Sequence, residues 1–368
     1  MAATGVIEDA PMLDATEPPE ARGVRRDAVR LLVSDVTSDT IAHATFADLP
    51  RYLSPGDLIV VNTSGTLNAA LDATTDRGEQ VELHLSTQLP GGFWTVEIRQ
   101  RGAPASLPLR RPFAGRTLTL AAGASAQILA PYPFIESVEA ASRLWLAALH
   151  TPQPVQSYLA AYGFPIRYSY LNGAWPGEMY QTVFATEPGS AEMPSASRPF
   201  SPELVTRLVS AGIQIAPLLL HTGVASLEDH EPPCEEFYRV PRQTAERINA
   251  ARREGYRVVA AGTTVVRAIE TVADEAGVAS AGRGWTDLVL SDDRPLRIVT
   301  ALISGLHEPQ ATHVRILEQA VRAAAGGRGS ARLDRHLDRA YAEARQRGYL
   351  WHEFGDSHLI IGARSAHP

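Results

Sequence analysis

Residues 179–223 read MYQTVFATEPGSAEMPSASRPFSPELVTRLVSAGIQIAPLLLHTG. The pattern predicts a strand, a loop punctuated by proline, a helix and a second strand that ends at His221. Ser201 is a typical N-cap, Pro202 suits the first helical turn, and Gly212 is a typical stop. We expect the loop to face a helix N-terminus and the histidine to lie at the end of a buried strand, where α/β proteins commonly place a site.

Strand and helix patterns alternate on both sides of this stretch. Residues 30–35 and 58–62 read as strands, and a buried strand at 256–262 runs into a helix. Residues 65–149 differ, because short alternating runs (VELHLS, FWTVEIRQ, TLTL, AQILA) are separated there by Gly and Pro. Strands at this spacing indicate a small antiparallel barrel or sandwich. The sequence therefore predicts an α/β main domain with a mixed sheet, formed by residues 1–64 and 150–368, and a small inserted antiparallel domain at residues 65–149, for which we expect a β-barrel.

Length and composition indicate a globular protein. The chain has 368 residues, of which 45% are hydrophobic, enough for a large core. It has no apolar run of about 18 residues and no signal-peptide pattern, so we expect a cytoplasmic protein without a membrane segment. The formal net charge of −7 disfavours a generic nucleic-acid coat, but one local basic face would suffice for RNA. We expect a monomer.

Two residue types exclude several kinds of chemistry. Cys234 is the only cysteine, which excludes disulfides within the chain, multi-cysteine zinc sites and three-thiolate iron–sulfur clusters. Lysine is absent, since all 34 basic residues are arginine, which excludes Schiff-base chemistry and the lysine of a P-loop. Neither GxGxxG nor GxSxG occurs. We expect no metal site.

A glycine and two threonines follow the strand at 256–262 and open the next helix. The backbone N–H groups and hydroxyls of Gly262, Thr263 and Thr264 could hold a carboxylate or a ribose. Arg267, one turn further on, could present a planar fork to an anion. A purely structural strand-to-helix cap is the alternative.

Three histidines are predicted at strand ends or in loops among polar residues. They are His221, His230 and His307. A histidine with a pKa near neutrality suits proton transfer, and Glu235 or Glu236 could orient or replace it. The alternative is an ordinary hydrogen-bonded loop histidine.

The C-terminal region offers two further candidates. Asp356 follows a glycine and is predicted either as a turn residue or as a ligand to a hydroxyl group. Aromatic residues interleaved with arginines at 335–354 could stack on RNA, although a solvated helix packed on the core has the same pattern.

A series of motifs occurs in order along nearly the whole chain. They read VRLLV, GDLIVVN, YQTVFATEPGS, LLHTG, EEFYRVP, AGTTVVRAIE, LHEP and GYLWHEFGDSHLI. In this order and spacing the chain resembles the S-adenosylmethionine:tRNA ribosyltransferase-isomerase family of queuosine biosynthesis, from about residue 13 to residue 361. YQTVFA together with AGTTVVR is the most specific pair.

The resemblance implies a fold and a reaction. The fold is an α/β domain with an inserted β-barrel. The reaction moves the ribosyl part of S-adenosylmethionine, the donor substrate, onto 7-aminomethyl-7-deazaguanine in tRNA and isomerises it, giving epoxyqueuosine-tRNA. Adenine and methionine are released, and no metal is implied.

Such a reaction needs three kinds of group. A base takes the proton from the ribose carbon beside the sulfonium, an acid assists the departure of adenine, and an anchor holds the methionine carboxylate. We expect His221 and Glu236 in the first two roles, with His307 as a competitor. The expected substrate-binding residues are Tyr180, Gln181, Ser195, Gly262, Thr263, Thr264, Arg267 and Asp356.

Several motif loops depart from the family pattern. Where the family reads close to NDTRV, residues 62–66 read NTSGT, and where it reads close to PTAGLHF, residues 194–200 read PSASRPF. The loops at 221–227, 230–236 and 304–312 also differ. Two alternatives therefore stay open: a paralogue that uses S-adenosylmethionine or a related nucleoside on a small-molecule acceptor, and a nucleoside-binding protein without catalysis.

Overall fold

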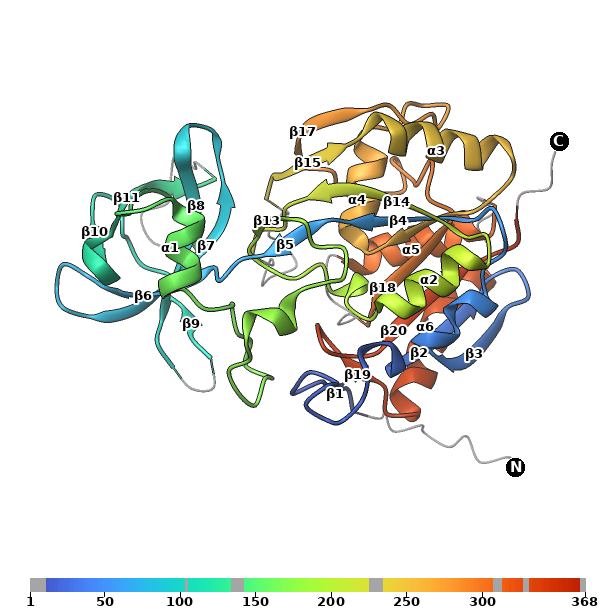
Figure 1. Cartoon of the computed structure of the whole chain (residues 1–368), viewed down its shortest axis with the longest axis horizontal. Coiled ribbons are helices and arrows are strands. Elements are labelled where there is room, and N and C mark those ends of the chain that lie inside the picture. Colours follow the sequence, from blue (N-terminus) through green and yellow to red (C-terminus); the bar gives the residue numbers. More distant parts are fainter. Residues whose placement is uncertain are drawn as a thin grey trace.

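A large mixed sheet and a small closed barrel lie side by side (Figure 1). The computed structural model describes residues 11–102, 105–133, 142–224, 234–306, 313–326 and 331–364. In spatial order the nine strands of the main sheet are β17 (Gly282–Thr286), β15 (Glu236–Val240), β14 (Gln214–Leu220), β4 (Leu58–Asn62), β16 (Val258–Ala261), β18 (Ala301–Gly305), β20 (Ser357–Ile361), β2 (Arg30–Asp35) and β3 (Thr40–Thr45).

The strand directions bring many chain ends to one edge of this sheet. Strands β14, β4, β16 and β18 are parallel neighbours, so all four end at the same edge, which we call the carboxyl edge. The antiparallel strands β15 and β20 begin there. Residues that follow or precede six different strands therefore meet at this edge, as expected for a site in an open α/β sheet.

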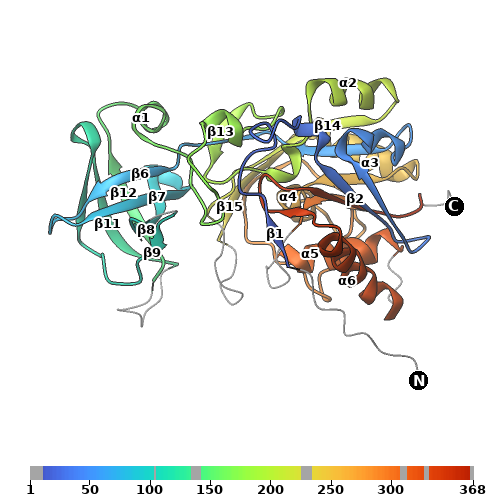
Figure 2. The same ribbon diagram turned by 90° about the horizontal axis from the view of Figure 1, so that it is seen from below.

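Helices cover both faces of the main sheet (Figure 2). Along β4, Leu58 and Val60 pack into one hydrophobic core, and Ile59 and Val61 into another on the opposite face. A strand that is apolar on both faces is typical of a sheet buried between helices. The first face packs against α3 (Arg242–Arg253), α4 (Thr263–Thr271), α5 (His313–Ala324) and α6 (Ala331–Gln346), and the second against α2 (Pro202–Ser210) and the 3-10 helix η2 (Phe46–Arg51).

The inserted unit is a closed antiparallel barrel. Its strands, in order, are β12 (Leu144–His150), β11 (Ser125–Tyr132), β10 (Thr117–Leu120), β6 (Ala70–Thr74), β7 (Gln80–Gln88) and β8 (Phe93–Gln100). Pairing of β12 with β8 closes it, and β9 (Leu107–Pro108) extends β8. The predicted fold class, a mixed-sheet α/β domain with an inserted small antiparallel barrel, is confirmed. The exact limits of the two domains stay a prediction, because α1 (Val155–Tyr162) buries Tyr158 and Leu159 in the barrel core.

Short elements complete the described chain. They are β1 (Leu13–Asp14), β5 (Ser64–Thr66), β13 (Glu187–Ser190), β19 (Leu350–Trp351), η1 (Arg26–Ala28), η3 (Pro90–Gly92), η4 (Ala121–Gly123), η5 (Gly177–Tyr180) and η6 (Ser195–Ser197).

The stretch at 179–223 forms its helix and second strand as predicted. The Ser201 hydroxyl accepts a hydrogen bond from the Leu204 amide at 3.1 Å, and Gly212 has φ +78° after the helix. The first strand was predicted in the wrong place: residues 181–186 form no strand, and β13 (Glu187–Ser190) lies at the start of the predicted loop at 187–199. The Ser201 hydroxyl also donates to Asp27 Oδ2 at 2.7 Å, so an acid already lies at the start of α2. The loop meets a different helix N-terminus, that of α4, where the Ser197 hydroxyl donates to the Ala261 carbonyl at 3.5 Å.

His358 in β20 is fully buried beneath α6. Its Nε2 atom lies 2.8 Å from Ser34 Oγ in β2, and the Tyr341 ring of α6 lies edge-on to it. Burial lowers the pKa of His358 to about 3, and the nearby His336 of α6 adds to this effect. The folded protein therefore holds His358 in its neutral form.

We expect the free energy of unfolding to fall as pH decreases from about 6.5, the ordinary histidine pKa, towards about 3. In that window the unfolded chain binds a proton at residue 358 that the folded chain does not, and each pH unit costs about 1.4 kcal/mol. Urea unfolding between pH 7 and pH 4 measures the slope. His358→Asn should flatten it, whereas His150→Asn, at an exposed position, should keep it. An equal slope in wild type and His358→Asn would contradict this expectation.

Candidate functional site

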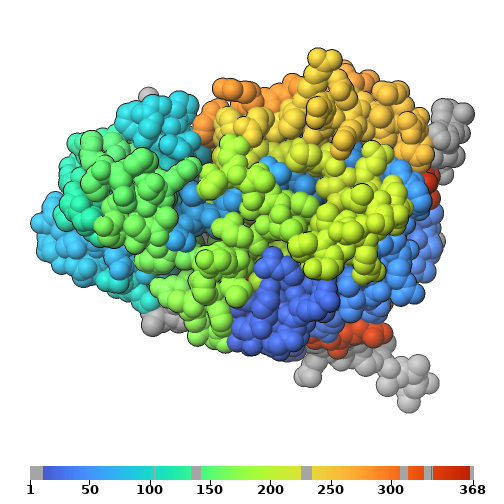
Figure 3. Space-filling model, viewed as in Figure 1, coloured from blue at the N-terminus to red at the C-terminus, as the bar shows by residue number. Residues whose placement is uncertain are grey.

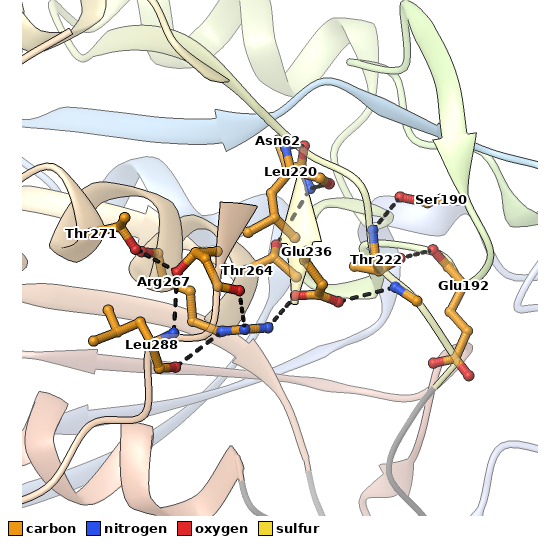
Figure 4. Close-up of polar contacts among 12 residues, drawn as sticks. Asn62, Ser190, Glu192, Leu220, Thr222, Glu236, Thr264, Arg267, Thr271 and Leu288 are labelled. Carbon is orange, nitrogen blue, oxygen red and sulfur yellow. Dashed lines mark hydrogen bonds and ion pairs between the residues drawn. The ribbon is translucent and has the colours of Figure 1, made fainter. Parts of the chain in front are cut away.

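Asn62 joins two strand ends at the carboxyl edge. Its side-chain Nδ2 donates to the Leu220 carbonyl at 2.8 Å, and its Oδ1 accepts from the Leu220 amide at 3.0 Å and from the Ser64 amide at 3.1 Å. The amide thus extends the pairing of β4 and β14 by one step, as Figure 4 shows for Asn62 and Leu220. Because Asn62 is fully buried, these bonds hold in place the residue before His221 and the backbone amide of Ser64.

The imidazole of His221 ends a chain of hydroxyl groups. Its Nδ1 atom lies 2.7 Å from Ser64 Oγ, which lies 2.6 Å from Ser190 Oγ. Ser190 Oγ in turn accepts from the Thr222 amide at 3.0 Å. Both serines are buried. Among the described residues, none forms a hydrogen bond with Nε2 of His221, so that nitrogen is the one available to a bound molecule.

Gly189 and Phe237 set the position of the His221 ring. A Cβ atom on Gly189 would lie 2.3–2.6 Å from three atoms of the ring, so the imidazole rests directly on the glycine backbone. The Phe237 ring is nearly parallel to the imidazole, with centroids 6.0 Å apart. Burial lowers the pKa of His221; Glu187 opposes this shift and Arg239 adds to it. At neutral pH the imidazole is therefore an uncharged proton acceptor.

Glu236 is held between Arg267 and the loop that follows His221 (Figure 4). Its Oε1 atom accepts from the Gly223 amide at 3.0 Å, and its Oε2 atom pairs with Arg267 Nη1. Burial raises the pKa of Glu236, and the adjacent guanidinium partly offsets the rise. Glu236 and Arg267, both predicted as site residues, therefore lie together, but they pair with each other.

Arg267 uses its remaining donors within the protein. Nε donates to the Leu288 carbonyl at 3.3 Å and Nη2 to the Thr286 carbonyl at 3.0 Å. Every guanidinium nitrogen thus donates to a protein group, and the side chain is 8% exposed. The structure does not present the expected open fork to an anion; it uses Arg267 to hold Glu236 in position.

The start of α4 lies at the carboxyl edge. Gly262 has φ +110°, which favours glycine, and no side chain caps the helix. Thr264 Oγ1 accepts from Asn62 Nδ2 at 3.4 Å, while the Thr263 hydroxyl has no hydrogen-bond partner among the described residues. Ala196 of η6 lies close to Gly262. The first-turn amides of α4 therefore remain available to an anionic group.

Two predicted binding residues have structural contacts instead. Gln181 donates to the Thr66 carbonyl at 2.8 Å and accepts from the Thr66 amide at 3.0 Å, so its amide acts like a strand partner of β5. Asp356 accepts from the backbone amides of Arg30 and Leu350 at 2.7 and 2.8 Å and pairs with the Arg30 side chain. These contacts hold Asp356 in the turn before β20, and its role as a ligand to a hydroxyl group stays a prediction.

Tyr180 and Ser195 keep unused hydroxyl groups. The Tyr180 hydroxyl is buried with no hydrogen-bond partner among the described residues, and burial raises its pKa to about 12. Ser195 is half-buried in η6, next to the start of α4. His307 and His230 lie outside the described residues.

The barrel closes against the loop that carries the site. The Ser86 hydroxyl of β7 accepts from the Val224 amide at 2.9 Å, and a Cβ atom on Gly223 would lie 2.7 Å from the same oxygen. The segment around residues 150–200 covers the junction between the two units at the surface (Figure 3). The site therefore lies at the carboxyl edge, where the barrel meets the main sheet.

Three residues of this site escaped the sequence reading. Ser64, Ser190 and Gly189 touch or support His221 but lie 157, 31 and 32 positions before it. Gly189 and Ser190 lie in the EPGS part of a quoted motif, but no sequence pattern distinguishes a serine that contacts a histidine from any other serine.

In the described part of the chain, no group of three or more His, Cys, Asp or Glu could hold a metal ion. No helix there is long and apolar enough to cross a membrane.

The fold and the histidine site define an α/β protein with an inserted barrel and a polar site at the carboxyl edge. Residues 10–360 match the family model described as queuosine biosynthesis protein. The chain belongs to this family.

Relatives match over almost their full length. A protein of Moorella thermoacetica is 36% identical over 347 residues, 91% of this chain and 94% of its own. One of Thermus thermophilus is 34% identical over 357 residues, 94% and 97%. Both are named S-adenosylmethionine:tRNA ribosyltransferase-isomerase. A crystal structure of the S-adenosylmethionine tRNA ribosyltransferase of Thermotoga maritima has 28% identity, covers 96% of this chain and 100% of its own, and has a TM-score of 0.48.

Gly189→Ala should displace the His221 ring, because the added Cβ atom would overlap it. We expect the pKa of His221 to rise towards its ordinary value of about 6.5 as the ring moves to solvent. Histidine proton NMR titration measures this directly and needs no assumption about activity. Gly173→Ala is the matched control, since a Cβ there meets no atom within 4 Å. An unchanged titration in Gly189→Ala would show that the glycine is not what positions the ring.

Proposed function

We propose that this protein transfers and isomerises the ribosyl moiety of S-adenosylmethionine onto 7-aminomethyl-7-deazaguanine in tRNA, forming epoxyqueuosine-tRNA and releasing adenine and methionine. The observation that carries this proposal is the uncharged, serine-supported His221 at the carboxyl edge of a chain that belongs to the queuosine biosynthesis family. Family membership and the names of the relatives favour this reaction over a small-molecule acceptor or a non-catalytic binding protein.

His221 is proposed as the base. The positive sulfur acidifies the neighbouring ribose C–H bond, and a neutral imidazole can take that proton. In the productive tautomer Nδ1–H donates to Ser64, whose hydroxyl donates to Ser190, leaving the Nε2 lone pair for the substrate. When Nε2 becomes protonated, the Ser64 oxygen and the nearby Glu187 carboxylate stabilise the imidazolium.

The start of α4, which no side chain caps, is proposed to anchor the methionine carboxylate. Gly262, Thr263 and Thr264 supply amides and hydroxyls there, and Ser195 belongs to η6, whose Ala196 lies close to Gly262. The acid that assists adenine departure is assigned to Glu236 or His307. Protonation of Glu236 competes with its ion pair to Arg267, because both carboxylate oxygens already accept hydrogen bonds.

The altered motif loop at 62–66 fits the same assignment. The family's acid and arginine are missing there, yet Ser64 contacts His221. Gly65 lies opposite Pro188 in the parallel pairing of β5 with β13. The loop therefore places β13, with Gly189 and Ser190, against the histidine.

We further propose that the protein acts in the cytoplasm, as a monomer, and that residues 65–149 form the inserted domain.

The test is incubation with S-adenosylmethionine and a tRNA that carries the deazaguanine precursor. We expect adenine release together with a mass gain on the wobble nucleoside. His221→Asn should lower the rate by at least about 100-fold, as expected for loss of a general base. His150→Asn should match the wild type. Adenine release that does not depend on tRNA would contradict the proposed acceptor, and wild-type activity in His221→Asn would contradict the proposed base.

Ser64→Ala should reduce turnover about tenfold without raising the KM for S-adenosylmethionine. The variant loses the hydrogen bond that orients the imidazole, about 1.4 kcal/mol, but retains the anchor at α4. Steady-state kinetics distinguish the two parameters. Ser38→Ala, at an exposed position, controls for general effects. A higher KM with unchanged kcat would assign Ser64 to binding.

A further inference from the structure

The turn between β19 and β20 holds Glu353 at the carboxyl edge. Ser357, which begins β20, pairs with Gly305 at the end of β18. Asp356 fixes the turn through the Leu350 and Arg30 amides, and His352 adopts a left-handed φ of +71°. A non-glycine residue in this conformation persists only where surrounding contacts enforce it, often at functional sites.

Rings on either side fix the same turn. The Tyr170 ring stacks on His352 with centroids 4.1 Å apart, and Tyr168 stacks on Tyr170 at 5.6 Å. His352 also contacts Asp14 Oδ1 at 3.1 Å. The Tyr180 ring lies 5.2 Å from Phe354. The residues before and after Glu353 are therefore both immobilised.

The Glu353 carboxyl group has no cationic partner among the described residues. Its Oε2 atom is buried and forms no hydrogen bond with any of them. Burial raises the pKa of Glu353 to about 7. The residue as a whole is half-buried, but a buried carboxyl oxygen without a partner costs stability, so its presence suggests a role in binding or proton transfer.

Further polar groups surround this carboxyl. The stack of Tyr168 on Tyr170 and of Tyr170 on His352 brings the Tyr168 ring close to the residue before Glu353. Burial, together with the charges of Glu192 and Glu353, raises the pKa of Tyr168 well above its ordinary value. The Tyr180 hydroxyl is an independent second sign of a ligand, because it is buried, only 4% of the residue is exposed, and it has no partner among the described residues. The Glu192 carbonyl accepts from Thr222 Oγ1 at 2.6 Å, which connects this region to the residue after His221.

The proposed reaction needs a further proton acceptor. His221 takes the proton of the ribose carbon, and the acid beside adenine donates a proton, so neither is left to deprotonate the acceptor amine. The acceptor is a primary amine, which is an ammonium ion near neutral pH and becomes a nucleophile only after losing a proton. Arg198 lies over the Phe354 ring at 4.9 Å but pairs with Glu20, and Arg167 and Arg198 both act on the pKa of Tyr180. Beside these cations, a carboxylate is the natural proton acceptor for an ammonium.

Resting on the proposed function, we propose that Glu353 is the base that deprotonates the acceptor ammonium, in a subsite that it forms with Tyr168, Tyr180 and Glu192. In this step one N–H bond of R–NH3+ breaks, its electron pair stays on nitrogen, and an O–H bond forms on Glu353. The products are R–NH2 and a neutral carboxylic acid, so charge and atoms balance.

The test compares Glu353→Gln with wild type, using the precursor tRNA, from pH 6 to pH 9.5. Wild-type kcat/KM for tRNA should rise through pH 7 and level off. At pH 7, Glu353→Gln should be about 100-fold slower and should recover as pH rises towards the pKa of the free amine. The KM for S-adenosylmethionine should not change. Glu254→Gln, at an exposed position after α3, is the matched control.

The possible outcomes distinguish the role of Glu353 from the proposed function of the protein. Glu353→Asp retains a carboxylate and should keep the wild-type shape of the pH profile at a reduced rate, which also guards against a folding defect in the glutamine variant. Wild-type kinetics in Glu353→Gln, or a loss that is equal at every pH, would overturn the role of Glu353 while leaving the proposed function intact. An inactive wild-type protein would overturn the proposed function and this role with it.

Discussion

The buried amide of Asn62 is the interaction on which the site depends. It bonds both backbone groups of Leu220 and the Ser64 amide, and so holds the ends of β4 and β14 in register. A hydrogen-bonded buried amide is strongly directional, because any shift would leave polar groups without partners. The 2.7 Å contact of Ser64 with His221 follows from that alignment.

The barrel and the linking segment both contact the loops at this edge. Ser86 of the barrel bonds the loop after His221, and Gln181 holds β5 through Thr66, at the point where the chain leaves the main sheet. The inserted domain therefore contacts the loop at 223–224 directly. Burial then adjusts the chemistry, lowering the pKa of His221 and raising those of Glu236 and Glu353.

Much of the fold was accessible from local patterns. Ser201, Pro202 and Gly212 bound α2 as their capping preferences predict, and the change to short alternating runs indicated the barrel. Of the candidate site residues, His221 and Glu236 lie near the same loop, whereas the side chains of Gln181, Arg267 and Asp356 bind protein groups. Residue type alone could not separate these uses, because an arginine that binds an anion and one that binds a glutamate have the same local sequence.

The sequence by itself determined the family, the α/β class with its inserted barrel, and the placement of His221 at a strand end. These properties depend on motif order, hydrophobic period and capping, all of which are local. Only the tertiary structure decided that Ser64, Ser190 and Gly189 surround that histidine, and that Glu353 Oε2 lies buried at the same edge without a partner among the described residues. Such contacts join residues far apart in the chain, and burial, which sets their pKa values, exists only once the strands have packed.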